Sequence, residues 1–215
     1  MGSMQAVLVD GDGLKWFNWL YLQVTEAVAG EVAAGRFSNR EWLTELDVQF
    51  ANLYFDALRT HLSGRRAPGC WRAVFGQRNQ APIARIQFAM AGINAHINRD
   101  LPVAVVNTCK ATGTAPVHDS AEYADYTAVN PTLEGLIASA RSELHVRLLG
   151  DALPHASHLE NTLGAWSVDA AREAAWTNAE ILWGLRPLKP LSERFLQSLD
   201  GLTALAGKTL LSPVP

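Results

Sequence analysis

Five polar residues lie within seven positions of an otherwise apolar stretch, "FAMAGINAHINRDLPVAVV", at residues 88–106. They are two asparagines, a histidine, an arginine and an aspartate, in the segment "NAHINRD" at residues 94–100. A histidine can take up and release protons near neutral pH, and a neighbouring carboxylate can orient it. Asparagine amides can donate hydrogen bonds to a developing oxyanion. The segment therefore predicts either an acid/base site or a polar network that only holds helices together.

The spacing of these residues predicts two pairs. On an unbroken helix, residues four apart share a face, so Asn94 pairs with Asn98 and His96 pairs with Asp100. The two pairs point in directions about 160 to 200° apart. Pro102 lacks an amide hydrogen and its ring crowds the carbonyl of Asn98, so we expect a bend or break nearby. Only such a bend would let both pairs converge on one pocket, because a straight helix leaves one pair as scaffolding.

Polar and aromatic residues on other predicted helices can complete a site with this segment. Arg172 is the natural counter-ion for a buried Asp47 or Asp100, since its planar fork can bind a carboxylate at two positions. Trp16 would supply a flat wall, together with Trp166 and Trp176. The predicted catalytic residues are His96, Asp100, Asp47 and Tyr54. The predicted substrate-binding residues are Asn94, Asn98, Asn18, Tyr21, Asn52, Trp166, Arg172 and Trp176.

Glycine, proline and capping residues divide the chain into helices and leave little room for strands. Ser38 with Glu41 forms a capping-box pattern before one of these helices, and Ser167 is the predicted cap of another. The stretch "QAVLV" at residues 5–9 is the only plausible strand, and one strand makes no sheet. A short turn is predicted at 70–75 and a weaker segment around 155–163. Helices are predicted over residues 14–34, 42–62, 83–111, 119–129, 132–149, 168–185 and 192–211.

These elements predict an all-α, single-domain bundle of about seven to nine helices over residues 1–215. The first four residues, "MGSM", resemble a cloning remnant and do not enter the fold prediction. The stretch over about 83–111 carries apolar residues in nearly every direction around a helix. We therefore expect it to be the buried central helix, where polar side chains cannot simply face water.

Composition and charge exclude several functional classes. The chain has 215 residues, a net charge of -3 and 18% charged residues, which argues against capture of nucleic-acid backbones by a basic surface. It contains no run of eighteen apolar residues that would predict a membrane span. Cys70 and Cys109 have no paired spacing. We expect a cytoplasmic protein without a membrane or nucleic-acid partner, whose oligomeric state, a homodimer included, the sequence leaves open.

Five segments carry a family resemblance: "GDGLKWFNWLYLQVT", "LDVQFANLYFDAL", "IQFAMAGINAHINRDLPVAVV", "YADYTAVN" and "WSVDAAREAAWTNAEILW". In this order they resemble the helical domain-of-unknown-function family 5995, which is found mostly in actinobacteria, and "AGINAHINRDLP" is the most specific part. The family has no settled activity. The resemblance implies an interior site built from several helices and suggests a natural-product-like substrate. The residues that match the family's motif positions are Asn18, Tyr21, Asp47, Asn52, Tyr54, Asn94, His96, Asn98, Asp100, Tyr126, Asn130, Trp166, Arg172 and Trp176.

The first predicted function is an enzyme that needs no cofactor and applies acid/base chemistry to a small, apolar substrate. His96 would move the proton, and Asp100 or Asp47 would orient it or act as the base. Asn94, Asn98 and Tyr54 would hold a developing oxyanion. Isomerisation, cyclisation, dehydration and hydrolysis all fit such a site, and the sequence does not choose among them.

Two other functions stay open. A metal-dependent hydrolase is suggested because His118 and Asp119 follow His96 and precede Asp169, loosely as in the H…HD…D pattern of helical phosphohydrolases. The central helix is also faintly similar to the His-rich helices of zinc-dependent phospholipase C proteins. Against a metal site, His118 falls in a predicted loop, and we assign no metal ligand. The third function is a non-catalytic binding or structural module, in which the buried polar residues only specify packing.

Overall fold

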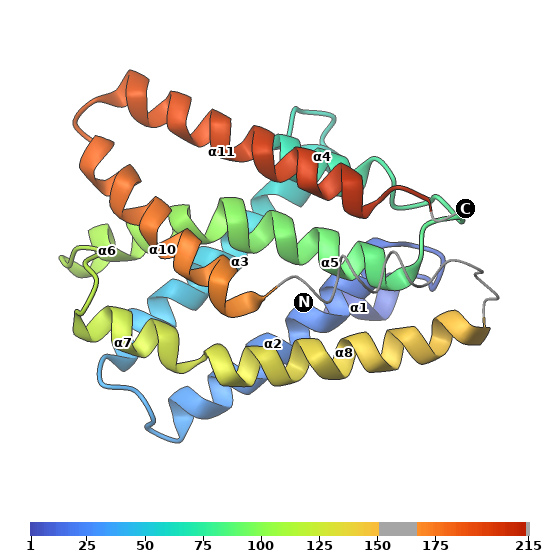
Figure 1. Ribbon diagram of the computed structural model, residues 1–215, viewed down its shortest axis with the longest axis horizontal. Coiled ribbons are helices and arrows are strands. Elements are labelled where there is room, and N and C mark those ends of the chain that lie inside the picture. The colour runs from blue at the N-terminus through green and yellow to red at the C-terminus, as the bar shows by residue number, and fades with distance from the viewer. Residues whose placement is uncertain (151–166, 214–215) are drawn as a thin grey trace.

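The computed structural model describes residues 1–150 and 167–213, and the side chains of 1–144 and 167–213. Within these ranges the chain forms helices and no strand, which confirms the all-α prediction (Figure 1). The predicted weak segment around 155–163 and Trp166 lie outside the described residues. The elements are α1 (Gly2–Val7), α2 (Leu14–Ala33), α3 (Arg40–Leu62), α4 (Gly69–Phe75), α5 (Arg85–Ala95), η1 (His96–Asp100), α6 (Leu101–Thr112), α7 (Ala121–Ala128), α8 (Asn130–Gly150), α10 (Val168–Leu185) and α11 (Lys189–Leu210).

A continuous rod made of α5, η1 and α6 runs through the middle of the bundle (Figure 1). All residues of α5 from Ile86 to Ala95 are buried. Helices α2 and α11 pack against α5, while α3 and α10 pack against α6. The buried central helix predicted for about 83–111 is therefore confirmed, and its buried polar side chains face other helices or a cavity.

The element η1 is a π-helical turn within this rod. The amide of Leu101 donates to the carbonyl of His96, five residues earlier, so the turn is wider than an α-helical one. Pro102 lies in the first turn of α6, where its ring would crowd the carbonyl of Asn98 in a regular α-helix. The wider turn relieves this clash. The predicted bend or break at Pro102 is thus replaced by a local widening, and the helix continues because other helices pack along its whole length.

The one plausible strand of the sequence, residues 5–9, does not form a strand. Residues 2–7 form α1, which packs against α2. The side-chain amide of Asn18 donates to Oε1 of Gln5 at 2.7 Å, so this polar contact ties α1 to α2. No strand of the described chain lies near to pair with a strand at this position, and a lone strand would leave its backbone groups without partners.

The N-terminal cap of α3 also differs from the prediction. Asn39, not Ser38, is the cap, and its side chain accepts a hydrogen bond from the amide of Trp42 at 3.1 Å. The carboxylate of Asp125 accepts the amides of Ser38 and Asn39, which fixes Ser38 outside the helix. The cap of α10 is as predicted, because Ser167 accepts a hydrogen bond from the amide of Ala170.

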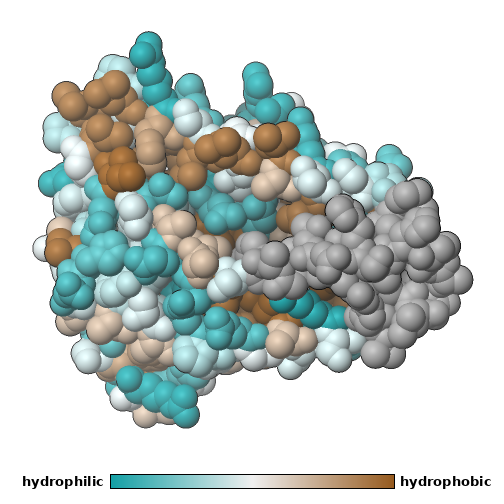
Figure 2. All heavy atoms as spheres, viewed as in Figure 1, coloured by the Kyte–Doolittle hydropathy of each residue, from teal (hydrophilic) through white to brown (hydrophobic). Residues whose placement is uncertain are grey.

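Apolar side chains gather on the surface over α11 and the end of α10 (Figure 2). No helix in the described part of the chain is both long enough and apolar enough to cross a membrane. The exposed large apolar residues of this region are Ile181, Leu188, Leu191, Leu202 and Leu205.

Gly92 allows α2 and α5 to approach each other closely, because a Cβ at this position would overlap the ring of Phe17. We predict that Gly92→Ala lowers the free energy of unfolding by about 1–3 kcal/mol, since the fully buried Phe17 would have to move. The control is Gly201→Ala in the exposed part of α11, where a Cβ meets no atom within 4 Å. That change should raise stability by roughly 0.5–1 kcal/mol. Urea denaturation measures both, and a stabilised Gly92→Ala variant would contradict the close packing.

Candidate functional site

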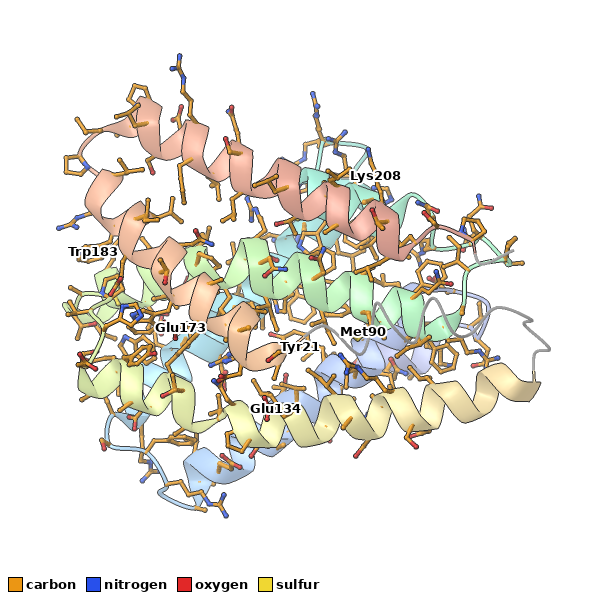
Figure 3. The ribbon with its side chains drawn as sticks, in the orientation of Figure 1. Tyr21, Met90, Glu134, Glu173, Trp183 and Lys208 are labelled. Atoms are coloured by element: carbon orange, nitrogen blue, oxygen red, sulfur yellow. The ribbon has the colours of Figure 1, made fainter. Side chains whose placement is uncertain are left out.

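A cavity of about 80 Å³ lies between α2, α3, the central rod, α8 and α10. Most of its wall is aliphatic or aromatic. Figure 3 places Tyr21, one of the lining residues, near the middle of the molecule, where α2 passes behind α10. A largely apolar cavity with a few polar groups is the usual form of a site for a small molecule. The polar lining residues are Tyr21, Thr25, Asp47, His96 and Arg172.

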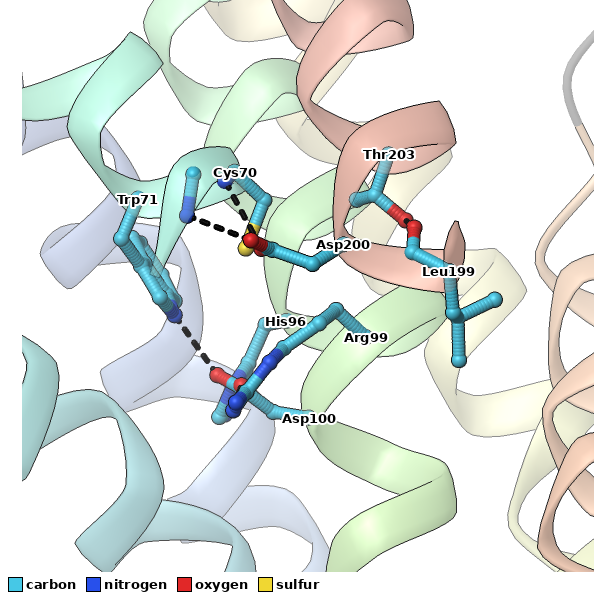
Figure 4. A network of polar contacts seen from close by, with 9 residues as sticks. Cys70, Trp71, His96, Arg99, Asp100, Leu199, Asp200 and Thr203 are labelled. Carbon is cyan, nitrogen blue, oxygen red and sulfur yellow. Dashed lines mark hydrogen bonds and ion pairs between the residues drawn. The ribbon is translucent and has the colours of Figure 1, made fainter. Parts of the chain in front are cut away.

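His96 and Asp100 form a buried pair on the π-helical turn. Nδ1 of His96 lies 3.1 Å from Oδ2 of Asp100. The same carboxylate accepts hydrogen bonds from Nε1 of Trp71 at 2.7 Å and from Nη1 of Arg99 at 2.8 Å (Figure 4). A carboxylate surrounded by donors acts as an acceptor, so this contact assigns the imidazole proton to Nδ1. Nε2 of His96 therefore carries the lone pair.

Nε2 is the ring nitrogen of His96 that Asp100 does not hold. It is buried and has no hydrogen-bond partner among the described residues. The ring of Phe50 stacks on the imidazole, with centroids 3.5 Å apart and planes 4° apart, and Tyr21 meets it at 4.6 Å with planes 75° apart. Burial lowers the pKa of His96 from its ordinary 6.5, although Asp100 acts in the opposite direction. The imidazole is therefore neutral at pH 7, which is the state that a general base requires.

Asp47 and Arg172 line the same cavity from α3 and α10. Burial raises the pKa of Asp47 to about 6, and the guanidinium of Arg172 opposes this shift. Arg172 is held by Asn130 Oδ1, which accepts from Nε at 2.6 Å, and by the carbonyl of Tyr126, which accepts from Nη2 at 2.6 Å. Its guanidinium also stacks on the Tyr126 ring at 3.9 Å. The cavity thus contains a fixed cation beside a carboxyl group that changes protonation close to neutral pH.

Asn94 and Asn98 face α11 and not the cavity. Nδ2 of Asn94 donates to the carbonyl of Thr203 at 3.0 Å, and Nδ2 of Asn98 donates to Oδ1 of Asn94 at 2.9 Å. Neither asparagine lines the cavity, whereas His96 does. The widened turn therefore does not bring the two predicted pairs together. The asparagine pair fastens the central rod to α11. Of the histidine pair, His96 lines the cavity, whereas Asp100 is fully buried and is not among the lining residues.

A family model described as "Family of unknown function (DUF5995)" matches residues 1–213. The chain belongs to this family. Its membership accounts for the resemblance over nearly the whole sequence and assigns no activity. No curated protein and no solved structure matches the chain. The chemistry of this DUF5995 member therefore has to be inferred from its own residues.

Five other predicted site residues of this DUF5995 member lie away from the cavity lining. Asn52 is exposed, because five residues along α3 turn it about 140° away from Asp47. Asn18 is buried against Gln5. Tyr54 is fully buried beside the imidazole of His96, with ring centroids 6.2 Å apart. Trp176 packs on Trp42 and Tyr126, and Trp16 lies under the guanidinium of Arg85.

Arg172 does not form the direct ion pair that was predicted with Asp47 or Asp100. The cation that binds Asp100 is Arg99, its neighbour in sequence. Arg172 acts on Asp47 through space, and no ion pair of 4.0 Å or less joins them in the described part of the chain. Its bound partners, an amide oxygen and a backbone carbonyl, are neutral.

The residues of the metal-hydrolase hypothesis are not brought together. His118 contacts Glu180 through Nδ1 at 2.7 Å and Glu173 through Nε2 at 2.8 Å, and Glu173 projects from α10 in Figure 3. His96 instead lies in the central rod, and Asp169 accepts a hydrogen bond from Asn130. No group of three or more His, Cys, Asp or Glu side chains in the described ranges is arranged to hold a metal. The geometry thus gives this hypothesis no support.

Three residues of the site were not predicted: Trp71, Arg99 and Phe50. A buried indole needs a partner for its N–H group, and this signal could have singled out Trp71. Phe50 follows Asp47 by three residues and hence shares its helix face. Arg99 lies beside Asp100 in the sequence, but adjacency alone does not reveal that the two side chains meet.

Proposed function

We propose that this DUF5995 member is an enzyme that applies acid/base chemistry to a small, largely apolar molecule. The observation that supports this best is the state of His96. Its Nδ1 is held by the buried carboxylate of Asp100, while its Nε2 is left without a partner among the described residues at the wall of an apolar cavity. When Nε2 takes a proton from the substrate, Asp100 stabilises the imidazolium that forms.

The other polar groups of the cavity supply the remaining parts of such a reaction. Asp47 is protonated below about pH 6, so its carboxyl group can return a proton to a second atom of the substrate. The guanidinium of Arg172 stabilises negative charge that develops on an oxygen of the substrate. Removal of one proton and delivery of another is an isomerisation. The same two steps serve a dehydration or a cyclisation when the proton goes to a leaving hydroxyl or to a newly attacked group.

The substrate has to displace Phe50. This ring covers one face of the imidazole, and Nε2 is buried. Phe50 is half-buried and lines the cavity, so a change of its side-chain rotamer would enlarge the cavity beside Nε2. The proposed chemistry needs no cofactor. From the family resemblance we add a natural-product-like substrate to the proposal, and from the unpaired spacing of Cys70 and Cys109 a cytoplasmic location.

A conversion screen tests the proposal. Purified protein is incubated with a library of small apolar acids, ketones, lactones and alcohols, and the products are followed by mass spectrometry. We expect at least one compound to be converted to an isomer or to a product lighter by one water. Asn52→Ala, an exposed change, should match the wild type, and His96→Gln should convert the compound at least a hundredfold more slowly. Saturable binding without conversion would overturn the proposal in favour of a binding module, and conversion at the wild-type rate in His96→Gln would remove the role of His96.

A further inference from the structure

Arg172 is a buried cation that no carboxylate in the described residues binds directly. Arg172 is only 5% exposed to solvent. Nε and Nη2 are used by the neutral partners Asn130 and Tyr126, whereas Nη1 donates to none of the described residues. Arg172 lines the cavity. A buried charge with neutral partners is costly unless an anion completes its surroundings.

The charged groups that the structure describes around the cavity do not supply that anion. Asp47 lies within electrostatic reach of Arg172, but its carboxyl group tends to take up a proton because it is buried. Asp100 already binds Arg99, Trp71 and His96. Asp169, on α10 with Arg172, is exposed to solvent and therefore screened.

Two neutral groups, Tyr21 and His96, line the cavity together with Asp47. Tyr21 of α2 keeps its proton, because burial raises its pKa well above the ordinary value. His96 of η1 is neutral, because burial lowers its pKa. Among the described residues that line the cavity, Arg172 is therefore the only charged group once Asp47 has taken up its proton, and none of them carries a negative charge to balance it.

We propose that the cavity binds a small carboxylic acid with an apolar body, whose carboxylate accepts hydrogen bonds from Nη1 of Arg172 and from the neutral carboxyl group of Asp47. This inference extends the proposed function by naming the substrate class, and it rests on that proposal only in taking this cavity as the site. A guanidinium fork matches a carboxylate well. A phosphate dianion would need further cations, which the lining residues do not offer.

The cavity volume limits the size of the acid. A dry apolar cavity of about 150 Å³ accommodates the six carbons of benzene, so a cavity of about 80 Å³ suits an apolar part of about three carbons, such as the isopropyl group of isobutyrate, with the carboxylate at Arg172. Longer acids would require Phe50 to turn aside. The aliphatic part of the acid would lie against the apolar side of the wall, which α2 and α8 supply through Val28, Leu133 and Ile137.

Binding of the carboxylate should be coupled to a proton. Two carboxylates cannot share the space beside one guanidinium without repulsion, so Asp47 has to be protonated in the complex. Above its pKa of about 6, each bound acid molecule then takes up one proton from solution. The affinity should fall by about tenfold for every pH unit above this value.

Isothermal titration calorimetry of the full chain with isobutyrate and with isobutyramide tests the inference. The two ligands have nearly the same shape, but only the acid is charged. We expect saturable binding of isobutyrate at pH 5.5, at least tenfold weaker binding of isobutyramide, and at least tenfold weaker binding of isobutyrate at pH 7.5. Equal affinity for acid and amide would overturn the inference, as would failure of acetate, isobutyrate, isovalerate and benzoate all to bind.

Three variants separate this inference from the proposed function. Arg172→Lys should bind isobutyrate at least tenfold more weakly. Because Arg172 is also bonded to its neighbours and its replacement can disturb folding, Asp47→Asn provides a second measurement, in which the affinity should no longer depend on pH between 5.5 and 7.5. His96→Gln should keep the binding of isobutyrate while it abolishes conversion. Conversion of neutral compounds without any binding of carboxylates would refute the carboxylic acid and leave the acid/base function standing.

Discussion

Replacement of His96 by glutamine is expected to lower kcat/KM for the acid/base reaction at least a hundredfold. Glutamine has no group that accepts a proton near neutral pH, and a positioned general base contributes roughly 10²- to 10⁴-fold to the rate. Its side-chain amide can still donate to Asp100, so that carboxylate keeps its third donor beside Trp71 and Arg99. The free energy of unfolding should change by no more than about 1–2 kcal/mol.

Asn98→Ala is the matched control, because Asn98 lies on the same π-helical turn but faces α11 through Asn94. It should lose stability by about 0.5–1.5 kcal/mol for one missing hydrogen bond and keep its turnover within threefold. Nitrogen NMR of the wild-type imidazole gives an independent reading, with Nδ1 protonated and Nε2 bare at pH 7. If the His96→Gln variant unfolds while its remaining folded fraction is fully active, His96 has only a structural role.

The helices were predictable because their ends are marked by local chemistry. For α10 the sequence predicts the observed bounds, since Ser167 caps its first turn. At Pro102 the sequence predicts the local clash, but how the chain relieves it depends on the helices packed around the rod. Helices α3, α10 and α11 pack along the rod on both sides of this position. A break would disturb all of these contacts, so a wider turn is the smaller change.

The site was predictable only in part, because helix spacing fixes which residues pair but not what the pair faces. The observed hydrogen bonds join Asn98 to Asn94 and His96 to Asp100 as the spacing of four predicts. The spacing does not reveal that α11 covers the asparagine pair or that a cavity adjoins His96, because both depend on how distant helices pack together. The contact of Trp71 with Asp100 spans 29 residues of sequence, and no local pattern specifies such a partner.

The fold also explains why the polar residues of the cavity differ from those that only hold helices together. The amide nitrogens of Asn94 and Asn98 each donate a hydrogen bond, so neither group is left without a partner. At the cavity, Nε2 of His96 is unsatisfied among the described residues and Asp47 is buried enough to shift its pKa. Groups left in such unfavourable states cluster at functional sites, where reactivity matters more than stability.

Asp47→Asn is expected to stabilise the fold at neutral pH and at the same time to lower turnover at least tenfold. The pKa of Asp47 is raised from its ordinary 3.8 to about 6 in the folded protein. Below pH 3.8 the group is protonated in both states and costs nothing. As the pH rises towards 6, the unfolded state releases its proton and the folded state does not, so stability falls, and above 6 the full loss is present.

Asparagine has nearly the same shape and is neutral at every pH, so the variant escapes this loss. One pKa unit corresponds to about 1.4 kcal/mol. Since Asp47 is half-buried, we expect a gain of roughly 1–3 kcal/mol at pH 7.5 and little gain at pH 3.5. Urea denaturation at the two pH values measures the difference. The control is Asp56→Asn, an exposed change on the same helix, which should stay within about 0.5 kcal/mol at both.

The activity of the Asp47→Asn variant decides whether the unfavourable burial of the Asp47 carboxyl group serves catalysis. With Asp47 as the acid and neutral His96 as the base, wild-type turnover should be highest between the lowered pKa of His96 and about pH 6, and it should fall above this range. The residual turnover of Asp47→Asn should no longer fall there. A variant that is more stable and less active shows that the carboxyl group is kept for function, whereas a destabilised variant with the wild-type pH profile would show that Asp47 only supports the fold.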